Sequence, residues 1–592
     1  MSPQKERLLP TGQGTAKDMS DKSENRMCQN CKLNFTIEPD DFSFYEKIKV
    51  PPPTFCPECR MIRRTIWRNH RSLSKRNCLL CNKFLITMYS DSVPVLCAEC
   101  FYGDNFIPEK YGKDYDFSRP FFAQLKDFFI FVPRLFSLRA GNLVNSDYTN
   151  YTKDNKNVYL SYSVSSSENV MYSENSDFLK NSVDNFAVKK SEGCYYNVGS
   201  DNNYNTYFVV LSNNCIDSSF VFDCINCSNC CLSYNIRNQK YVFNNQKLPK
   251  KEYEEKIKEL KLETYSGQQE AIKKFDDLIE NNAVHRYASI HHSENVISGD
   301  YISNSKNIKY CFNAYDSENI SYSNRVLGVK DCMDCQGIGF GSELVYESVA
   351  STISAFKCSF SYLCINNCRD CEYSFILKNC QNCFGCVSLT NASYCIFNKQ
   401  YPKKEYFMMV EKIKKQMNDI PYVDSKGREY RYGEFFPYDM CPFGYNETNT
   451  LDFFPISKEE AVSRGYFWKE KEKRDYGATM QSSNIEDSIL NVKEGILDEI
   501  IECPNNGNQI YQCSTAYRII QEELNFYRQK NIPLPRYCPN CRHYQRLKYY
   551  NPMKLWHRKC MKEGCTNEFE TSYSPDRPEI IYCERCYQQE VY

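Results

Sequence analysis

Through the middle of the chain, the pattern of polar and apolar residues repeats every twelve residues. An asparagine or similar residue marks most steps, and an apolar residue usually follows it, as in Asn307 before Ile308. The later array has Asn295, Asn307, Asn319, Asp331, Glu343, Ala355, Asn367, Asn379 and Asn391. The earlier array has Asn145, Asn157, Asn169 and Asn181 and, after one short step, Asn202, Asn214, Asn226 and Asn238. Such a short period predicts a β-solenoid whose stacked asparagines share hydrogen bonds, with coils that hold either one repeat or two.

Both arrays end in a similar way, and this predicts the domain boundaries. A Pro-Lys-Lys-Glu-Tyr segment follows each array and leads into an amphipathic helical pattern, which would cap an open solenoid end. We therefore expect solenoid arrays at 142–248 and 285–401, a helical insert at 249–284, and a helical cap and linker at 402–502. Within that linker, Ser457–Arg464 and Glu486–Ile501 are expected to be α-rich. A disordered leader (1–26) and a bridge (103–141) complete the N-terminal part.

Cysteine content is the first sign of chemistry, with 34 in 592 residues. The first residues lack the apolar core of a signal peptide, and the apolar run Phe128–Pro133 is too short to span a bilayer. We therefore expect a cytoplasmic protein without a membrane partner. Its cysteines should be reduced thiols or metal ligands.

Four CxxC pairs near the N-terminus predict two zinc sites within residues 27–102. The pairs are Cys28 and Cys31, Cys56 and Cys59, Cys78 and Cys81, and Cys97 and Cys100. Each pair can turn two thiolates toward one ion, and two pairs complete a tetrahedral shell. The simplest assignment joins consecutive pairs, and an interleaved arrangement is the rival.

The C-terminal segment 503–592 repeats this framework. The spacing from Cys31 to Cys56 equals the spacing from Cys513 to Cys538, and the motif CPECR recurs as CPNCR. The predicted ligands are Cys503, Cys513, Cys538, Cys541, Cys560, Cys565, Cys583 and Cys586. Cys503 is the nearest substitute for a cysteine missing at Ile510. We therefore predict that the two modules arose by internal duplication and that four zinc ions stabilise them.

Both modules carry a basic segment after the second cysteine pair. The candidate nucleic-acid-binding residues are Arg60, Arg63, Arg64, Arg68, Arg71, Arg76, Arg542, Arg546 and Arg558. Helical spacing would place several on one stripe among aromatic residues, which suits phosphate contact and base stacking in RNA. The competing interpretation pairs these arginines with acids such as Glu38, Asp40 and Asp41 and makes the protein a binding scaffold for other proteins.

Overall charge and the histidines argue against other functions. Lys and Arg total 74, as do Asp and Glu, so there is no global basic field. The six histidines include His285, His291 and His292, but no hydrolase, phosphate-loop or dinucleotide motif accompanies them. Cys224, Cys227 and Cys230 resemble part of an iron–sulfur pattern, yet the array cysteines recur in phase with the repeat, which favours stacked thiols. We therefore expect no enzyme, and a solenoid enzyme acting on a polysaccharide is the remaining catalytic alternative.

The segments FCPECRMIRRTIWRNHRSLSKRNC and IPLPRYCPNCRHYQRLKYYNPMKLWHRKC and the two PKKEY array ends resemble an uncharacterised bacterial family. Its members have duplicated cysteine-rich zinc modules around a central repeat region. Similar sequences sometimes bear a CoA-transferase label, which no motif in this chain supports. The resemblance strengthens the architecture predicted from the repeat and the cysteines, which is a mainly β fold with an Asn/Cys-rich β-solenoid between treble-clef or zinc-ribbon-like modules and short helical inserts.

Overall fold

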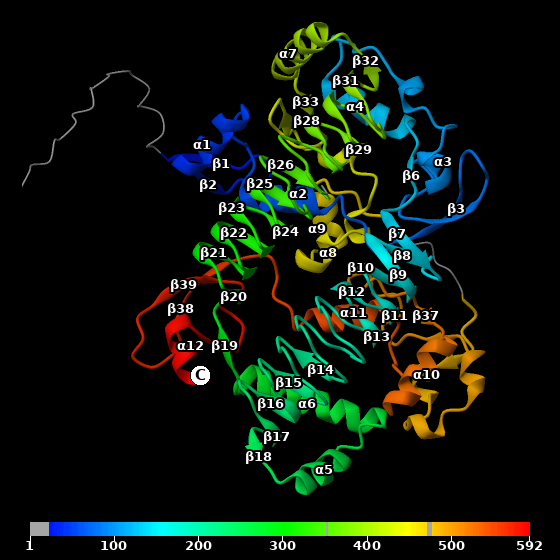
Figure 1. The fold of residues 1–592 in the computed structure, drawn as a ribbon, viewed down its shortest axis with the longest axis vertical. Coiled ribbons are helices and arrows are strands. Elements are labelled where there is room, and N and C mark those ends of the chain that lie inside the picture. Colours follow the sequence, from blue (N-terminus) through cyan, green and yellow to red (C-terminus); the bar gives the residue numbers. More distant parts are fainter. Residues whose placement is uncertain (1–22, 351–352, 471–475) are drawn as a thin grey trace, which may run out of the picture.

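The computed structural model describes residues 23–350, 353–470 and 476–592. It is a mixed α/β structure with more strand than helix, and many of its strands are short and parallel. None of the described helices combines the length and the apolar character needed to cross a membrane. Two stacks of strands extend from the middle of the molecule toward opposite ends (Figure 1).

The first array stacks parallel strands, each paired with the strand one repeat farther along the chain. Val158 pairs with Val170, and Val209 pairs with Val221. A final antiparallel pair, β17 with β18, closes the stack. The strands are β7 (Arg139–Val144), β8 (Thr149–Asn150), β9 (Thr152–Tyr159), β10 (Ser161–Ser165), β11 (Glu168–Met171), β12 (Glu174–Asp177), β13 (Lys180–Val183), β14 (Tyr207–Val210), β15 (Ser219–Phe222), β16 (Ser228–Tyr234), β17 (Lys240–Phe243) and β18 (Gln246–Lys247).

The second array follows the same rule with a local exception. Ile308 pairs with Ile320, and Cys383 pairs with Cys395, so the partners in both pairs are one repeat apart. The strands are β20 (Ile290–His291), β21 (Glu294–Ser303), β22 (Lys306–Tyr315), β23 (Glu318–Ser321), β24 (Asn324–Leu327), β25 (Lys330–Gln336), β26 (Tyr346–Val349), β27 (Tyr362–Ile365), β28 (Arg369–Glu372), β29 (Phe375–Lys378), β30 (Gln381–Phe384), β31 (Ser393–Ile396) and β32 (Lys399–Gln400).

In the exception, the step between paired residues lengthens by one position, because Lys330 pairs with Glu343 and Glu343 with Phe356. The predicted stacking of Glu343 and Ala355 in phase with the repeat is therefore wrong. Leu344 and Lys357 take the left-handed backbone there instead. A single extra residue per coil shifts the corner along the chain without breaking the parallel pairing.

Left-handed backbone at every third residue gives the coils their corners. Asn169, Tyr172, Asn175 and Phe178 all have φ between 53° and 57°. Four such corners and the pairing of neighbouring repeats make one coil equal to one repeat, so the alternative of two repeats per coil is excluded. Left-handed backbone is unfavourable for most side chains and least so for asparagine, which explains why asparagine marks the repeat.

Asparagine ladders run along the edges of both arrays, as predicted from the period of the sequence. Asn145 donates a side-chain hydrogen bond to Asn157 (3.1 Å), which donates to Asn169 (2.9 Å). In the second array, Asn295 donates to Asn307 (2.9 Å), which donates to Asn319 (2.7 Å). The amide groups thus link successive coils along the stack.

Replacing Asn307 by Ala should lower the free energy of unfolding by about 1–2 kcal/mol, through the left-handed backbone and two lost hydrogen bonds. Asn307→Gly keeps the backbone preference and loses only the hydrogen bonds, so it should lose less stability. Urea unfolding monitored by circular dichroism measures both. If both variants unfolded at the same urea concentration as the wild type, the ladder would not stabilise the array.

Two modules rich in cysteine lie beside the arrays. The N-terminal module contains β1 (Glu24–Met27), β2 (Asn34–Ile37), α1 (Pro39–Ile48), α2 (Pro57–Thr65), β3 (Ser74–Asn77), β4 (Phe84–Thr87), β5 (Val95–Leu96) and α3 (Ala98–Tyr102). The C-terminal module contains β36 (Ile501–Glu502), β37 (Ala516–Tyr517), α10 (Gln521–Lys530), α11 (Pro539–Leu547), β38 (Trp556–Lys559), β39 (Glu568–Thr571), β40 (Ile580–Tyr582) and α12 (Glu584–Val591).

Each module also pairs with the strand that precedes one array. β5 pairs with β6 (Arg134–Leu135), which leads into the first array, and β40 pairs with β19 (Val284–Arg286), which leads into the second. A bridge with η1 (Pro108–Tyr111) and α4 (Phe121–Phe131) connects β5 and α3 to β6.

The remaining helices follow the arrays. α5 (Lys250–Glu259) and α6 (Tyr265–Asn281) form the predicted insert, and α7 (Lys403–Asp419) follows the second array as the predicted cap. The linker holds β33 (Tyr422–Val423), β34 (Glu429–Tyr430), η2 (Tyr438–Met440), η3 (Tyr445–Glu447), α8 (Thr450–Phe453), α9 (Lys458–Ser463), β35 (Met480–Gln481), η4 (Ser482–Asn484), η5 (Ile489–Asn491) and η6 (Glu494–Leu497).

Two expectations about connecting segments need correction. Glu486–Ile501 is not α-rich, because it forms only the short turns η5 and η6 before β36. The expected leader, 1–26, lies outside the described residues up to position 22, and β1 begins at Glu24 inside its last part. Pairing of β1 with β2 makes those last residues part of the module.

Candidate metal centres and the module–array interface

The sixteen predicted ligands lie in four groups of four cysteines. Within each group the sulfur atoms all lie within 4.8 Å of one another. The groups are Cys28, Cys31, Cys56 and Cys59; Cys78, Cys81, Cys97 and Cys100; Cys503, Cys513, Cys538 and Cys541; and Cys560, Cys565, Cys583 and Cys586. Consecutive pairs share a group, so the arrangement is the sequential one. Cys503 lies in the third group with Cys513, Cys538 and Cys541.

All four groups are built from the same local structure. The first pair lies at the turn of a two-stranded hairpin, and the second pair starts a helix with a cysteine at the N-cap, as Cys56 does for α2. Its backbone N–H donates to the first cysteine's Sγ, at 3.3 Å in Cys56 to Cys28. The equivalent bonds are Cys97 to Cys78 (3.3 Å), Cys538 to Cys503 (3.4 Å) and Cys583 to Cys560 (3.3 Å). Backbone donors and a helix N-terminus both stabilise thiolates, the form that binds metal.

The helix that starts at the second pair then carries arginines into the second array. Arg60, Arg63 and Arg64 of α2 are at most 2 % exposed. Arg60 Nε lies 2.9 Å from Asp334 Oδ2, and Arg64 Nη1 lies 2.9 Å from Asp334 Oδ1. Burial lowers the pKa of Arg60, but the Asp334 carboxylate and the neighbouring Tyr45 and Tyr346 together outweigh burial and raise that pKa well above its ordinary value. The Arg60 guanidinium is therefore charged, and Arg60 and Arg64 share the Asp334 carboxylate.

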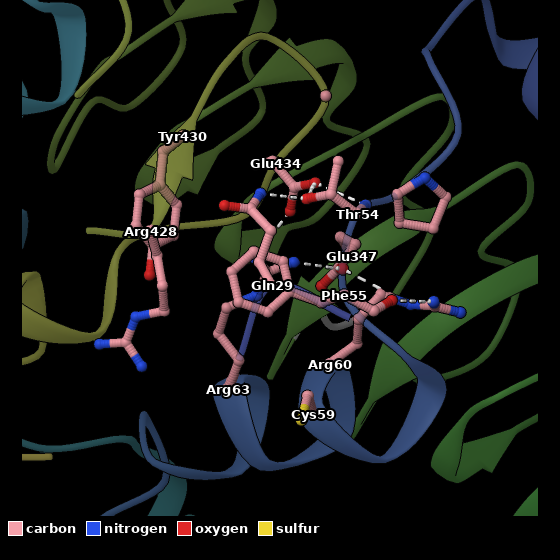
Figure 2. A network of polar contacts seen from close by, with 12 residues as sticks. Gln29, Thr54, Phe55, Cys59, Arg60, Arg63, Glu347, Arg428, Tyr430 and Glu434 are labelled. Carbon is pink, nitrogen blue, oxygen red and sulfur yellow. Dashed lines mark hydrogen bonds and ion pairs between the residues drawn. The ribbon is translucent and has the colours of Figure 1, made fainter. Parts of the chain in front are cut away.

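Arg63 connects the array to the linker as well. Its Nη2 lies 2.8 Å from Glu347 Oε1 in β26, and its Nη1 lies 2.8 Å from Glu434 Oε2 (Figure 2). Glu434 also accepts hydrogen bonds from the backbone and hydroxyl of Thr54, just before the second cysteine pair. One buried network thus joins the metal group, the array and the linker.

The C-terminal module repeats this arrangement on the first array. Arg542 and Arg546 of α11 both contact Asp184, and Arg542 also lies 3.0 Å from Glu523. Burial lowers the pKa of Arg542, and Asp184, Tyr527 and Glu523 raise it well above its ordinary value. The basic segment of each module is therefore buried against an array.

The two interfaces use equivalent residues. Arg64 Nη2 donates to the carbonyl of Tyr322 (2.9 Å), and Arg546 Nη2 donates to the carbonyl of Tyr172 (3.0 Å). The number of residues from Tyr172 to Tyr322 equals the number from Asp184 to Asp334. The duplication therefore includes the arrays. Each module inserts the helix that starts at its second cysteine pair, α2 or α11, into the array that lies farther from the module along the chain.

The expectation of an exposed basic stripe is therefore wrong. Besides the five arginines above, Arg68 is buried over the Tyr151 ring, 4.6 Å from its centroid, and Arg71 lies 2.7 Å from Asp452. Arg76 and Arg558 are partly exposed and donate to carbonyls of their own modules, at Ser90 and Ser574. The competing interpretation correctly expected the arginines to pair with acids. The acids it proposed, Glu38, Asp40 and Asp41, are not the partners.

Asp334, Glu347, Glu434, Asp184 and Glu523 are the acids that sequence reasoning missed. Asp41, one of the predicted partners, instead lies 3.1 Å from Lys309 and accepts from Tyr322. A usable signal existed. Asp184 and Asp334 each lie three positions after a ladder residue, and both hold a charge where the preceding coil carries a tyrosine, Tyr172 or Tyr322.

Gly337 shows how tightly this interface is packed. Its φ is +71°, and a Cβ there would lie 2.0 Å from Arg68 Nη1. The glycine-rich GIGFG segment is therefore a close-packed turn of the array, as the sequence suggested. A side chain at position 337 would displace Arg68.

The remaining candidate groups have structural partners. His285 is buried, with its ring nitrogens 3.0 Å from Tyr573 Oη and 2.9 Å from the carbonyl of Ile279. All 34 cysteines lie within the described residues, and no disulfide joins any two of them there. Array cysteines such as Cys371 and Cys383 pair in register inside the stack, and Cys371 Sγ lies 3.6 Å from the carbonyl of Cys380 in the next coil. They pack as small apolar residues.

Comparison with known proteins adds little to this picture. No protein-family model matches the chain, and no curated protein matches it. One similar solved structure is described as a "putative acetyltransferase from Desulfovibrio desulfuricans G20". It is 9 % identical, with a TM-score of 0.09, over 49 % of this chain and 85 % of that one. At this level the similarity carries no argument about fold or activity.

Proposed function

We propose that this protein is a non-enzymatic scaffold in which four zinc ions hold two β-solenoids in one rigid body. The observation that carries the proposal is the buried arginine–carboxylate network at both module–array interfaces. Each network is formed by a helix whose first turn carries two cysteines of a metal group. Fixing those cysteines fixes the helix, and the helix fixes the array.

Zinc is the ion that fits the four groups. Four thiolates in a closed shell are typical of structural zinc, which binds sulfur tetrahedrally and has no redox chemistry of its own. The hairpin and helix that supply the two pairs resemble treble-clef and zinc-ribbon modules. Small modules of this kind depend on the metal for much of their folding free energy.

A β-solenoid is the architecture that the array geometry supports. Parallel pairing of neighbouring repeats, four corners per coil and asparagine ladders between successive coils all support one chain wound into a stack. Such a stack is rigid and offers long flat faces. Those properties suit a scaffold that binds other proteins.

The exposed array surface supports protein partners over nucleic acid. Lysines and glutamates alternate between coils: Lys156 lies 2.8 Å from Glu168, and Lys306 lies 3.1 Å from Glu294. These pairs neutralise each other on the surface. Binding to phosphates requires unpaired cations, and six of the nine arginines expected to provide them are buried, namely Arg60, Arg63, Arg64, Arg68, Arg542 and Arg546.

A filter-binding assay with a random RNA pool at about 50 mM and about 200 mM salt tests the choice of partner. We expect weak retention with little dependence on salt. An Arg76→Ala, Arg558→Ala double variant, which changes the two partly exposed arginines, should behave as the wild type. Affinity that falls steeply with salt and is lost in this variant would replace the scaffold by an RNA-binding protein.

A further inference from the structure

A second type of potential ligand group is buried where the C-terminal module meets the first array. Glu174 begins β12, Asp452 lies in α8 and His543 lies in α11. One ligand atom from each lies within 4.8 Å of the others. Their side chains are 2 %, 0 % and 4 % exposed. Three distant segments of the chain thus bring two carboxylates and an imidazole together away from water.

Two atoms of this group have no hydrogen-bond partner among the described residues. They are Glu174 Oε2 and His543 Nε2. The nearest contacts across the group are 3.6 Å from His543 Nδ1 to Glu174 Oε2 and 3.5 Å from His543 Nε2 to Asp452 Oδ2. These distances are too long for good hydrogen bonds, and leaving a buried polar atom unpaired costs about 1–3 kcal/mol. A bound species between the side chains would remove this cost.

Neighbouring residues orient the two carboxylates, Glu174 mainly through Oε1 and Asp452 mainly through Oδ1. His70 Nδ1 lies 2.8 Å from Glu174 Oε1, to which Asn449 also donates at 3.0 Å. Arg71 Nη2 donates to Asp452 Oδ1 at 2.7 Å, and Arg71 Nε lies 3.5 Å from Glu174 Oε2. Such outer contacts are typical of groups that hold metal ligands in place.

The two unpaired atoms suit a cation better than an anion. Glu174 Oε2 is a carboxylate oxygen, which can only accept hydrogen bonds, and His543 Nε2 faces the second carboxylate, Asp452, at 3.5 Å. An anion between these atoms would lie beside two carboxylates, whereas a metal ion would be bound by them. Arg71 contacts both carboxylates and the partly buried Arg325 also interacts with Glu174, so these guanidinium groups balance the carboxylates.

We propose that Glu174, Asp452 and His543 bind a divalent first-row transition-metal ion. Oxygen and imidazole ligands suit Mn²⁺, Fe²⁺ and Zn²⁺, in contrast to the thiolate groups at the two ends. The ion would tie α11 and α8 to β12, and the burial of its ligands means that it enters as the chain folds. This site is independent of the scaffold function, because it uses none of the sixteen cysteines.

The site can be tested by elemental analysis of full-length protein produced in medium supplemented with Mn²⁺, Fe²⁺ or Zn²⁺. The wild type should contain one equivalent of metal beyond the zinc bound to sulfur, and His543→Gln and Asp452→Asn should each lose that equivalent and keep the sulfur-bound zinc. The matched control is Glu570→Gln, a carboxylate of the same module whose side chain is 42 % exposed, which should keep all of the metal.

The wild-type protein decides the question even if a variant does not fold. In Mn²⁺-supplemented protein, electron paramagnetic resonance should show one tightly bound Mn²⁺ per chain that dialysis does not remove. No extra equivalent with any of the three ions would overturn the proposal and leave an ion-pair cluster. An extra equivalent that persists in both His543→Gln and Asp452→Asn would place the ion elsewhere and overturn it as well.

Discussion

Serine at both Cys56 and Cys59 is expected to unfold the start of the N-terminal module and release α2 from the second array. Two of the four ligands of one group are lost, and structural zinc contributes about 10–16 kcal/mol of apparent binding free energy in small modules. A whole domain is stable by only about 5–15 kcal/mol, so a loss of this size is decisive. Hydrogen exchange measured by mass spectrometry should show loss of protection in α2 and in β25 and β26, which α2 contacts.

Cys194→Ser is the matched control for this experiment. Cys194 is also buried, but it lies in the first array, where Ser182 and Thr206 occupy the positions one coil before and after it. A hydroxyl therefore fits there, and protection should change only near the substitution. Protection of α2 that survives in the double variant would show that packing alone holds the helix.

Alanine at Asp334 should be nearly as damaging, at about 3–5 kcal/mol of unfolding free energy. The substitution leaves the guanidinium groups of Arg60 and Arg64 buried beside an apolar side chain, and removing one partner of a buried ion pair has this typical effect. Asp184→Ala should lose a similar amount, because it leaves Arg542 and Arg546 in the equivalent situation. Chemical denaturation of both variants measures the loss.

Asp331→Asn provides the control, close to Asp334 in the same strand. Asp331 pairs with Lys47, whose side chain is 51 % exposed, and asparagine removes that ion pair but still accepts the ladder hydrogen bond from Asn319 and suits the left-handed backbone, so the loss should amount to about 1 kcal/mol or less. A loss at Asp334 no larger than at Asp331 would show that the buried pairs do not hold the module to the array. Very different losses at Asp334 and Asp184 would contradict the equivalence of the two interfaces.

Local chemistry explains which features could be predicted from the sequence. A CxxC pair fixes two thiols close together in the chain, so Cys28, Cys31, Cys56 and Cys59 could be grouped from spacing alone. The ladder of Asn295, Asn307 and Asn319 could be predicted because identical side chains meet whenever the coil equals the repeat. Neither inference needs to know how distant segments pack.

The features that could not be predicted depend on distant packing. Arg60 and Arg64 have no acid nearby in sequence that pairs with them, and their partner Asp334 lies in the second array, far along the chain. A basic segment read alone predicts an exposed surface, because charged side chains are rarely buried without a partner. The corners were also hidden, since residues such as Tyr172 and Phe178 adopt a left-handed backbone that their own preferences oppose.

The central claim is that the sixteen cysteines bind four zinc ions. It is tested most directly by measuring the metal content of the purified full-length protein and its X-ray absorption spectrum at the zinc edge. The account predicts four zinc ions per chain bound by sulfur, each with four sulfur neighbours at about 2.3 Å. An additional zinc ion at Glu174, Asp452 and His543 would bring only nitrogen and oxygen neighbours, so it would raise the zinc content to five and lower the mean number of sulfur neighbours per zinc below four. Zinc near zero, or iron in excess of zinc, would contradict the account.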